Sequence, residues 1–348
     1  MARLDDLSER EARILDAIIQ LYVENAEPAG SQAVAARSRL GVSAATVRNT
    51  MSELETRGYL YHTHTSSGRV PTDLAYRVYV DRLMRHAPPS SRDRERIESE
   101  VSGLTVGGGA IEEILKRAAQ VLGVLTQELG VAVAPALDAA ILERLELVRV
   151  SSERLLVVLT LQSGFVRTIF LEVPSAVAPE VVEHVARILN ERLAGLPLGE
   201  IRASVGERLR DADGTGKGTG LLNVFVAQRD DVFDAEPDGG GLLLGSAQPL
   251  ADQPEFASNG RMRDLLELTE RRDLLRSAFE AHRRRGLTIT IGTENDDPKL
   301  AEFTLVTASY RRGELAGVVG VLGPTRMPYD KIIGLVDHTS RLVEGLLT

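Results

Sequence analysis

The sequence predicts an α+β protein that begins with a winged helix-turn-helix and continues into an α+β sheet domain interrupted by an insertion. Residues 31–57 read as two helices joined by a short turn with a glycine, and residues 59–71 read as a strand hairpin directly after them. Strand-like runs occur in two later groups, at 142–172 and 287–322, with helical and glycine-rich segments between them. This order, in which helices and irregular chain separate two groups of strands, indicates one sheet domain with a segment inserted into it.

Length and composition are those of a globular chain of two or three domains. The 348 residues are too many for one ordinary core, and 43% are hydrophobic and 26% charged. The longest apolar runs, such as Leu155–Leu161 and Leu315–Leu322, are far shorter than a membrane span. The first ten residues are charged and contain no apolar core of a signal peptide, and there is no cysteine for a disulfide or a thiolate metal site. We therefore expect a cytoplasmic protein.

The net charge of −9 is unevenly distributed along the chain. Residues 1–88 hold 11 Arg and 11 Asp or Glu and are neutral, so residues 89–348 carry the whole −9. Within residues 37–85, eight Arg stand against four acidic residues. DNA affinity depends on where cations meet phosphates rather than on the total charge. The acidic total therefore does not exclude DNA binding.

The first helix is predicted from a capping box and an apolar stripe. Ser8-Glu9-Arg10-Glu11 has the capping-box spacing. Apolar residues follow it at helical intervals, namely Ile14, Leu15, Ile18, Ile19 and Tyr22. Glu27–Gly30 then breaks the helix, and Ser31 is expected to cap a short second helix, Gln32–Arg37.

The third helix has the features of a DNA recognition helix. Leu40-Gly41-Val42 forms the turn before it, Ser43 is expected to cap it, and Gly58 to end it. Three residues can pack against the first helix: Val47, Met51 and Leu54. Small and polar residues remain on the outer face: Ser43, Ala45, Arg48, Asn49 and Ser52. Arg48 can donate to guanine or phosphate, and Asn49 can pair with adenine. A helical hairpin with a solvated polar face fits the same spacing.

The hairpin after the third helix favours the winged helix-turn-helix. Tyr59–His64 alternates like a strand, Thr65–Arg69 is a turn, and the return strand begins at Val70. The turn offers an arginine, hydroxyls and a glycine, which suit contacts with the DNA backbone or the minor groove. His62 and His64 alternate on the strand with no third ligand nearby, so we expect surface residues rather than a metal site.

Beyond a linker at 87–91, the remaining elements follow from helical spacing and alternation. Helices are predicted at Arg92–Val101, Ile111–Leu129, Val181–Leu193, Gly199–Leu209, Arg261–Arg284 and Asp330–Leu347. Strands are predicted at Leu142–Val150, Arg154–Leu161, Val166–Glu172, Leu287–Ile291, Phe303–Tyr310 and Glu314–Leu322. Short turns join the first three strands, which indicates an antiparallel meander.

Two segments of the N-terminal region resemble a known family. HTSSGRVPTDLAYRVYVDRLM, residues His64–Met84, closely resembles the signature after the wing in the HrcA family of heat-inducible transcription repressors. VSAATVRNTMSELETRGYL, residues Val42–Leu60, is similar to that family's recognition helix. Ser67 and Ala75 are mild departures from the family pattern. The helix after the wing carries three residues on one face that we expect to pack rather than touch DNA: Tyr76, Tyr79 and Val80.

The resemblance implies a domain order and a set of partners. The expected parts are a winged-helix domain at 1–88, a GAF-like domain at 89–174 and 259–348, and an inserted dimerisation domain at 175–258. The family binds an inverted-repeat operator before chaperone genes as a homodimer, with a chaperonin that supports the active repressor. The candidate DNA-binding residues are Ser31, Gln32, Ser43, Ala45, Thr46, Arg48, Asn49, Ser52, His64, Thr65, Ser66, Ser67, Gly68 and Arg69.

No catalytic residue, cofactor or metal is predicted. Gly214–Thr219 looks like a phosphate loop, but the earlier glycine is missing and Lys217 is followed by glycine. The six histidines form no evident nucleophile–base motif. Two alternatives remain: a winged-helix repressor controlled by a small effector in its GAF-like domain, and an enzyme with a winged-helix targeting module. A ligand that changed thermal stability and operator affinity together would favour the first, and clustered carboxylates or a true phosphate loop would favour the second.

Overall fold

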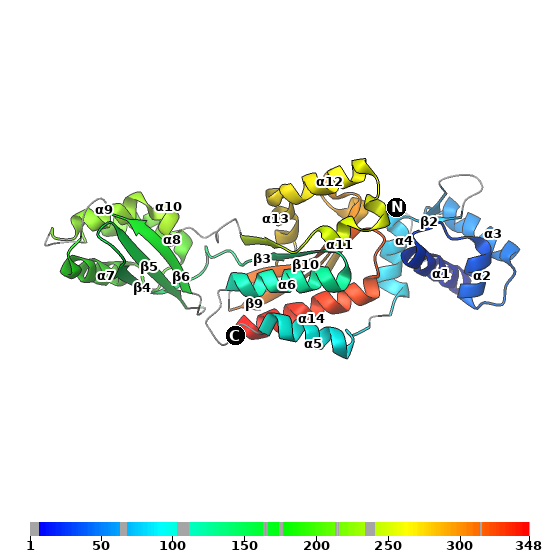
Figure 1. Cartoon of the computed structure of the whole chain (residues 1–348), viewed down its shortest axis with the longest axis horizontal. Coiled ribbons are helices and arrows are strands. Elements are labelled where there is room, and N and C mark those ends of the chain that lie inside the picture. Colours follow the sequence, from blue (N-terminus) through cyan, green and yellow to red (C-terminus); the bar gives the residue numbers. More distant parts are fainter. Residues whose placement is uncertain are drawn as a thin grey trace.

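The computed structural model has three parts arranged in a row (Figure 1). The winged helix lies at one end, a five-stranded sheet domain in the middle, and a three-stranded sheet with its helices at the other end. The structure describes residues 7–62, 68–85, 87–102, 111–162, 164, 166–173, 177–212, 214, 216–233, 241–313 and 315–347. In this described part, no helix is long and apolar enough to cross a membrane.

The winged helix follows the predicted order of elements. It contains α1 (Glu9–Asn25), α2 (Ser31–Ser38), α3 (Ala44–Thr56), β1 (Leu60–Tyr61), β2 (Val70–Pro71), α4 (Asp73–Val78) and a π-helical turn (Tyr79–Leu83). Ser8 and Glu11 form the predicted capping box, and Ser43 caps α3 as predicted. The prediction that Ser31 caps α2 is wrong, because Gly30 holds the cap position and Ser31 is already helical. Strands β1 and β2 pair antiparallel, as a wing requires.

The middle part, the sheet domain (residues 87–134 and 241–347), is a sheet covered by helices on both faces. Its helices are α5 (Ser91–Ser102), α6 (Ile111–Thr126), α11 (Gln248–Ala251), η3 (Pro254–Phe256), α12 (Asn259–Glu270), α13 (Arg272–Glu280), η4 (Gly292–Glu294), η5 (Pro298–Leu300) and α14 (Tyr329–Leu347). Its strands are β3 (Leu129–Val133), β7 (Leu242–Leu244), β8 (Thr288–Ile291), β9 (Phe303–Arg312) and β10 (Leu315–Pro324), in the antiparallel order β7-β3-β10-β9-β8.

Alternate strand residues divide the core of this domain into two layers. Ala132 and Val319 share a core with α5, α6 and α14, and that core continues into the winged helix. Val131 and Val318 face the opposite way and pack with α12 and α13. This is the two-residue period of a sheet with both faces buried.

Two strands of this sheet are not foreseen from the sequence. All five residues of β3 are buried, so the segment shows no alternation and reads as a continuation of the helix predicted at 111–129. Gln127, with φ of 63°, ends that helix in the structure. Strand β7 has only three residues. The predicted long helix at 261–284 is instead two helices, α12 and α13, with a break at Arg271.

The third part is a separate domain with its own core. It contains β4 (Leu142–Arg149), β5 (Arg154–Leu161), β6 (Val166–Glu172), α7 (Pro179–Leu193), α8 (Leu198–Leu209), α9 (Thr219–Ala227) and α10 (Arg229–Val232). The predicted antiparallel meander is confirmed, in the order β4-β5-β6. One face of this sheet packs against α7 to α10 in a core distinct from those of the sheet domain.

The insertion begins earlier in the structure than the 175–258 expected from the sequence. The chain leaves the sheet domain after β3 and returns at β7, and these two strands are neighbours with Val133 opposite Leu242. The Ala134 amide donates to the Gly241 carbonyl oxygen at 2.8 Å. We therefore call residues 135–240 the inserted domain. Alternation identifies a strand but not the sheet that it joins. The sequence pattern therefore does not show that the meander belongs to the inserted domain rather than to the sheet domain. The predicted fold class, α+β with an N-terminal winged helix and an interrupted sheet domain, is confirmed.

One buried carboxyl makes the stability of this fold depend on pH. Glu128, just before β3, is 1% exposed, and its Oε2 accepts a hydrogen bond from Gln253 Nε2 at 3.0 Å. Burial raises the pKa of Glu128 well above 4.5, although the Gln253 hydrogen bond and the charge of Arg326 act against the rise. The folded state therefore holds this proton more tightly than the unfolded chain does. The protonated Glu128 carboxyl contributes fully to the free energy of unfolding below pH 4.5. This contribution is lost as the pH rises through the folded pKa.

We expect Glu128→Gln to remove this loss and to raise the free energy of unfolding at neutral pH. The gain is about 1.4 kcal/mol for each unit by which the wild-type pKa is raised. Urea unfolding of both chains across a pH series measures it. Identical pH slopes for the two chains would show that Glu128 does not carry the effect.

Candidate nucleic-acid interface

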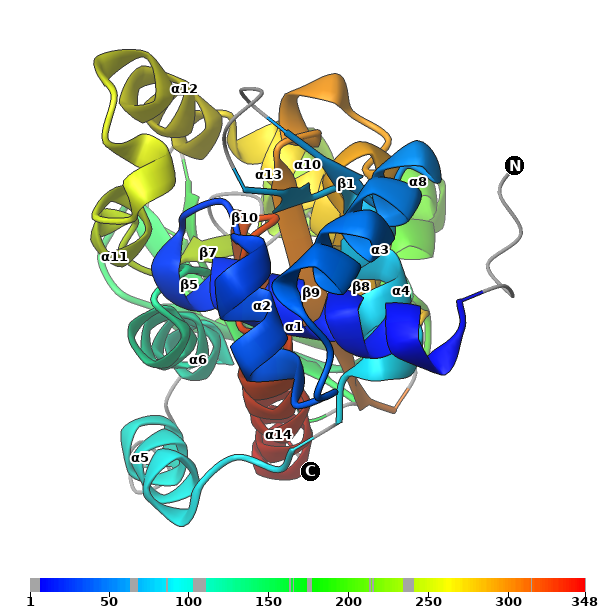
Figure 2. The ribbon, with the colours of Figure 1, turned by 90° about the vertical axis from the view of Figure 1, so that its right-hand side faces the viewer.

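Helix α3 is held firmly against the rest of the winged helix. Four of its side chains are buried: Val47, Thr50, Met51 and Leu54. At its start, the Ser43 hydroxyl accepts from the Thr46 amide at 3.2 Å. Figure 2 views this end of the molecule with α1, α2 and α3 in front of the sheet domain. A rigid helix of this kind can present its opposite face to a partner.

The opposite face of α3 brings together the residues predicted to read DNA. Ala45, Arg48, Asn49 and Ser52 are exposed, and Thr46 is half-buried. The Ser52 hydroxyl donates to the Arg48 carbonyl oxygen at 3.2 Å, so the helix itself uses that group. Among the described residues, the side chains of Arg48 and Asn49 have no hydrogen-bond or ion-pair partner. Their donors and acceptors are therefore available to the edges of bases.

Helix α2 contributes less to this surface. Gln32 is exposed at its start, whereas Ser31 is half-buried. Both lie at the N-terminal end of the helix, where backbone amides are not used by the helix itself and can meet a phosphate.

Five arginines of the winged helix form ion pairs inside the protein. The pairs are Arg13 with Glu9, Arg37 with Glu24, Arg57 with Glu11, Arg69 with Glu55 and Arg77 with Glu294. Arg39 and Arg48 are both exposed and have no such partner within the residues that the structure describes. Arg39 ends α2 with φ of 52°, in the turn of the helix-turn-helix. It adds a cation to the surface that the sequence analysis missed, although the basic excess in this region was a signal for it.

The base of the wing is pinned to the segment between α1 and α2. Arg69 and Ala29 exchange two backbone hydrogen bonds, of 2.9 and 3.0 Å. A Cβ atom on Gly68 would lie 2.5 Å from the carbonyl oxygens of Pro28 and Ala29, so this approach requires glycine. Of the predicted wing residues, Gly68 and Arg69 thus lie at the base. His64, Thr65, Ser66 and Ser67 lie outside the described residues.

Glu55 of α3 ties both arms of the wing to the recognition helix. It accepts from Arg69 Nε at 2.8 Å, and it also pairs with Nδ1 of His62. Burial alone would raise the pKa of Glu55, but the His62 hydrogen bond and the Arg69 charge outweigh it, so the pKa is lowered. The carboxylate is therefore charged at neutral pH. Sequence reasoning missed Glu55 because its partners lie seven and fourteen residues away.

The pairing of Arg69 with Glu55 gives a direct test of the wing. We expect Arg69→Ala to weaken binding to all DNA sequences alike and to reduce the slope of log affinity against log salt by about one. Glu55→Gln should keep that slope, because it loosens the wing without removing the cation. Titrations of both variants at several salt concentrations measure it. An unchanged slope in Arg69→Ala would show that this residue does not contact the phosphate backbone.

Among the described residues, no group of three or more His, Cys, Asp or Glu is placed to hold a metal ion. His62 instead pairs with Glu55.

Comparisons with known proteins match the chain to a family model, to relatives and to a solved structure. The family model described as the HrcA protein C terminal domain matches residues 112–333. A heat-inducible transcription repressor HrcA from Chlorobium phaeobacteroides (strain BS1) is 41% identical over 96% of this chain and 96% of its own length. One from Prosthecochloris aestuarii is 38% identical over 96% of this chain and 95% of its own. A crystal structure described as that of a hypothetical protein covers 99% of both chains with a TM-score of 0.67 at 24% identity, which shows a shared fold.

Proposed function

Because the chain belongs to the HrcA family of heat-inducible transcription repressors, we propose that it represses chaperone genes as a homodimer on an inverted-repeat operator. The observation that carries this proposal is the outer face of α3. Arg48 and Asn49 are exposed there with no hydrogen-bond or ion-pair partner among the described residues, on a helix fixed by its buried face. Arginine and asparagine are the side chains that read guanine and adenine in the major groove. A repressor must reach chromosomal DNA, so we place the protein in the cytoplasm.

The recognition surface we propose includes all the residues expected from the sequence, and Arg39. Base contacts come from Arg48 and Asn49. Ala45 and Ser52 are small enough to let α3 enter the groove. The remaining residues position the helix and the wing on the backbone, namely Ser31, Gln32, Arg39, Ser43, Thr46, His64, Thr65, Ser66, Ser67, Gly68 and Arg69.

A second copy of the chain is needed because one winged helix makes a small interface with DNA. Residues 89–348 are acidic and repel phosphate, so they contribute to DNA binding by positioning the winged helices. They pair two winged helices, and the two-fold symmetry of the pair matches an inverted repeat.

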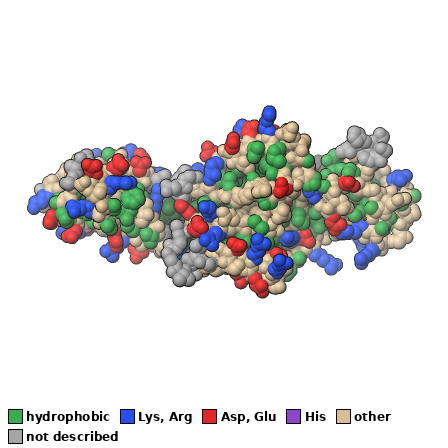
Figure 3. Space-filling model, in the orientation of Figure 1, with side chains coloured by type: hydrophobic (Ala, Val, Ile, Leu, Met, Phe, Trp, Pro, Cys, Tyr) green, Lys and Arg blue, Asp and Glu red, His purple; other side chains and the backbone are tan. Residues whose placement is uncertain are grey.

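The inserted domain offers a surface for this pairing. The side of its sheet away from α7 carries apolar side chains that are exposed or half-buried. We call this side the open face, and its apolar residues are Val148, Leu156, Val158, Val166 and Phe170. Val166 is 61% and Phe170 56% exposed, and Figure 3 shows hydrophobic side chains on this domain among charged ones. The Arg154 guanidinium lies 4.8 Å from the centre of the Phe170 ring. Large exposed apolar residues on a flat sheet favour burial against a partner.

Regulation by a chaperonin, like the choice of chaperone genes, rests on the family resemblance alone. A chaperonin would support the active repressor, and heat would draw the chaperonin to unfolded proteins and so release repression. At a fixed repressor concentration, removal of chaperonin should then lower the fraction of operator that is bound.

Deletion of the gene tests the function. Transcripts of chaperone genes should rise at the normal growth temperature, and the wild-type chain should restore repression. A chain with Arg48→Ala and Asn49→Ala should not restore it, although it is expressed and folded. Unchanged chaperone transcripts in the deletion strain would contradict the proposed function.

A further inference from the structure

The winged helix is joined to the sheet domain by a buried aromatic contact. Tyr76 of α4 packs on Tyr329 at the start of α14, with ring centroids 5.7 Å apart. Both residues are at most 1% exposed and belong to one continuous core. Apolar contacts hold two bodies together but are non-directional. This contact therefore provides adhesion, to which polar contacts can add direction.

The first polar contact across the joint comes from Arg77, one residue further along α4. Its Nε donates to Glu294 Oε1 at 2.8 Å, and its Nη2 donates to the Ile289 carbonyl oxygen at 2.7 Å. Glu294 is itself held in place, because its Oε2 accepts from the Ile291 amide at 2.9 Å. A planar guanidinium with two fixed acceptors defines a direction as well as a distance.

The second contact lies at the start of α4. Asp73 Oδ2 accepts from the amide and the hydroxyl of Thr293, at 2.9 and 3.0 Å. A Cβ atom on Gly292 would lie 2.2 Å from that carboxylate oxygen, and Gly292 has φ of 53°. The backbone turn of η4 is therefore built to let α4 come this close.

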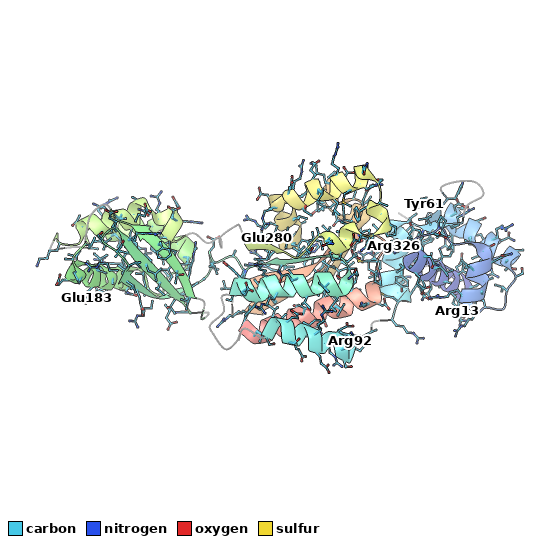
Figure 4. The ribbon with its side chains drawn as sticks, viewed as in Figure 1. Arg13, Tyr61, Arg92, Glu183, Glu280 and Arg326 are labelled. Atoms are coloured by element: carbon cyan, nitrogen blue, oxygen red, sulfur yellow. The ribbon has the colours of Figure 1, made fainter. Side chains whose placement is uncertain are left out.

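The third contact is made by Arg326, from the loop after β10, with a different helix of the winged helix. Its Nη1 donates to the Val23 carbonyl oxygen near the end of α1 at 2.7 Å. Its other nitrogens pair with Glu255 of η3, one of them at 3.0 Å. The Arg326 side chain is only 13% exposed. Figure 4 shows it at the boundary between the sheet domain and the winged helix.

These contacts join two helices of the winged helix to separate segments of the sheet domain. We propose that Arg77 and Arg326 are positioning residues that fix the angle of the winged helix on the sheet domain. In the dimer, this angle sets the half-site spacing that the two recognition helices read. The first step, the fixed angle, does not rest on the proposed function. The second step, the half-site spacing, does.

The first step can be measured without DNA. The natural chain has no cysteine, so Arg10→Cys on α1 and Gln120→Cys on α6, both exposed, give one spin label on each side of the joint. Pulsed electron paramagnetic resonance then measures the distribution of label distances in the intact chain, diluted with unlabelled chain. The test variant carries Arg77→Gln, Glu294→Gln, Arg326→Gln and Glu255→Gln, which removes the Arg77–Glu294 and Arg326–Glu255 ion pairs. Asp81, which also pairs with Arg77 at 3.2 Å, is kept because it is exposed to solvent.

We expect one narrow distance distribution in the labelled wild-type chain and a broad one in the test variant. The matched control is Arg208→Gln with Glu200→Gln, an ion pair of 2.7 Å within the inserted domain. It should leave the distribution narrow. Equal widths in the test variant and the wild-type chain, with both folded by circular dichroism, would overturn the proposal.

The second step is measured on DNA duplexes that carry the operator identified by genome-wide binding. The spacer between its half-sites is lengthened or shortened. The test variant should bind a single half-site as the wild-type chain does. It should bind the natural spacing about tenfold more weakly, within the 10²–10⁴ gain that a well-matched linkage supplies, and discriminate less between spacers. Unaltered spacer discrimination would overturn this step. Loss of single half-site binding would show that these residues act on the reading surface instead.

Discussion

A chain in which Asn-Gly replaces residues 135–240 should be a monomer that binds operator about 10²–10⁴ times more weakly than the intact chain. The deletion is structurally mild, because β3 and β7 are already paired and the Ala134 amide already donates to the Gly241 carbonyl oxygen. A two-residue Asn-Gly turn closes such a pair of antiparallel strands. Leu315, which packs against the inserted domain, should be changed to Ser in this chain to avoid a new apolar surface.

The loss is expected because two linked reading heads bind the second half-site intramolecularly, whereas a monomer binds each half-site alone. Sedimentation gives the oligomeric state, and titration of operator and single half-site duplexes gives the two affinities. Half-site affinity should be unchanged. A deletion chain that remained a dimer with full operator affinity would place the pairing surface in the sheet domain.

A point variant of the intact chain locates the pairing surface within the inserted domain. Phe170→Lys puts a charge on the open face and should also give a monomer. Asn223→Lys adds the same charge at an exposed position of α9 and should remain a dimer. If both variants remained dimeric, the open face would not be the interface.

The second large effect is expected on the recognition helix. Arg48→Ala and Asn49→Ala should each cost about 1–3 kcal/mol of binding free energy and relax base preference at one operator position. Neither change should unfold the protein, because both side chains are exposed and form no hydrogen bond or ion pair with other described residues. Thr56→Ala, at the far end of the same exposed face, is the control.

Titration against duplexes with single base changes checks this prediction. The wild-type chain should discriminate at the position that Arg48 or Asn49 reads, and the corresponding variant should not. A variant that bound operator and changed duplexes as the wild-type chain does would remove that residue from the reading surface.

Sequence reasoning succeeded where the signal is local. Ser8 with Glu11 and Ser43 with Thr46 are contacts over three residues, and their capping patterns predicted helix starts that the structure confirms. The meander at 142–172 was likewise visible in the alternation of its strands. Such features depend on residues close together in the chain, so one sequence contains them.

It failed where contacts join distant segments or where burial hides the pattern. Strand β3 is buried on both faces, and β7 is recognisable only from its pairing with β3. Arg326 meets Val23 across 303 residues, and no local pattern predicts that hydrogen bond. The ion pair of Arg69 with Glu55 was missed for the same reason, because Glu55 lies beside Arg69 only once the wing has folded back on α3.

The measurement that tests the central claim most directly is genome-wide binding of the intact chain, compared with the Arg48→Ala, Asn49→Ala chain. We predict that wild-type sites share an inverted repeat beside chaperone genes, with half-sites spaced for a two-fold dimer. The double variant should lose these sites. Sites without an inverted repeat, or an unchanged set of sites in the double variant, would contradict a dimeric repressor that reads DNA with α3.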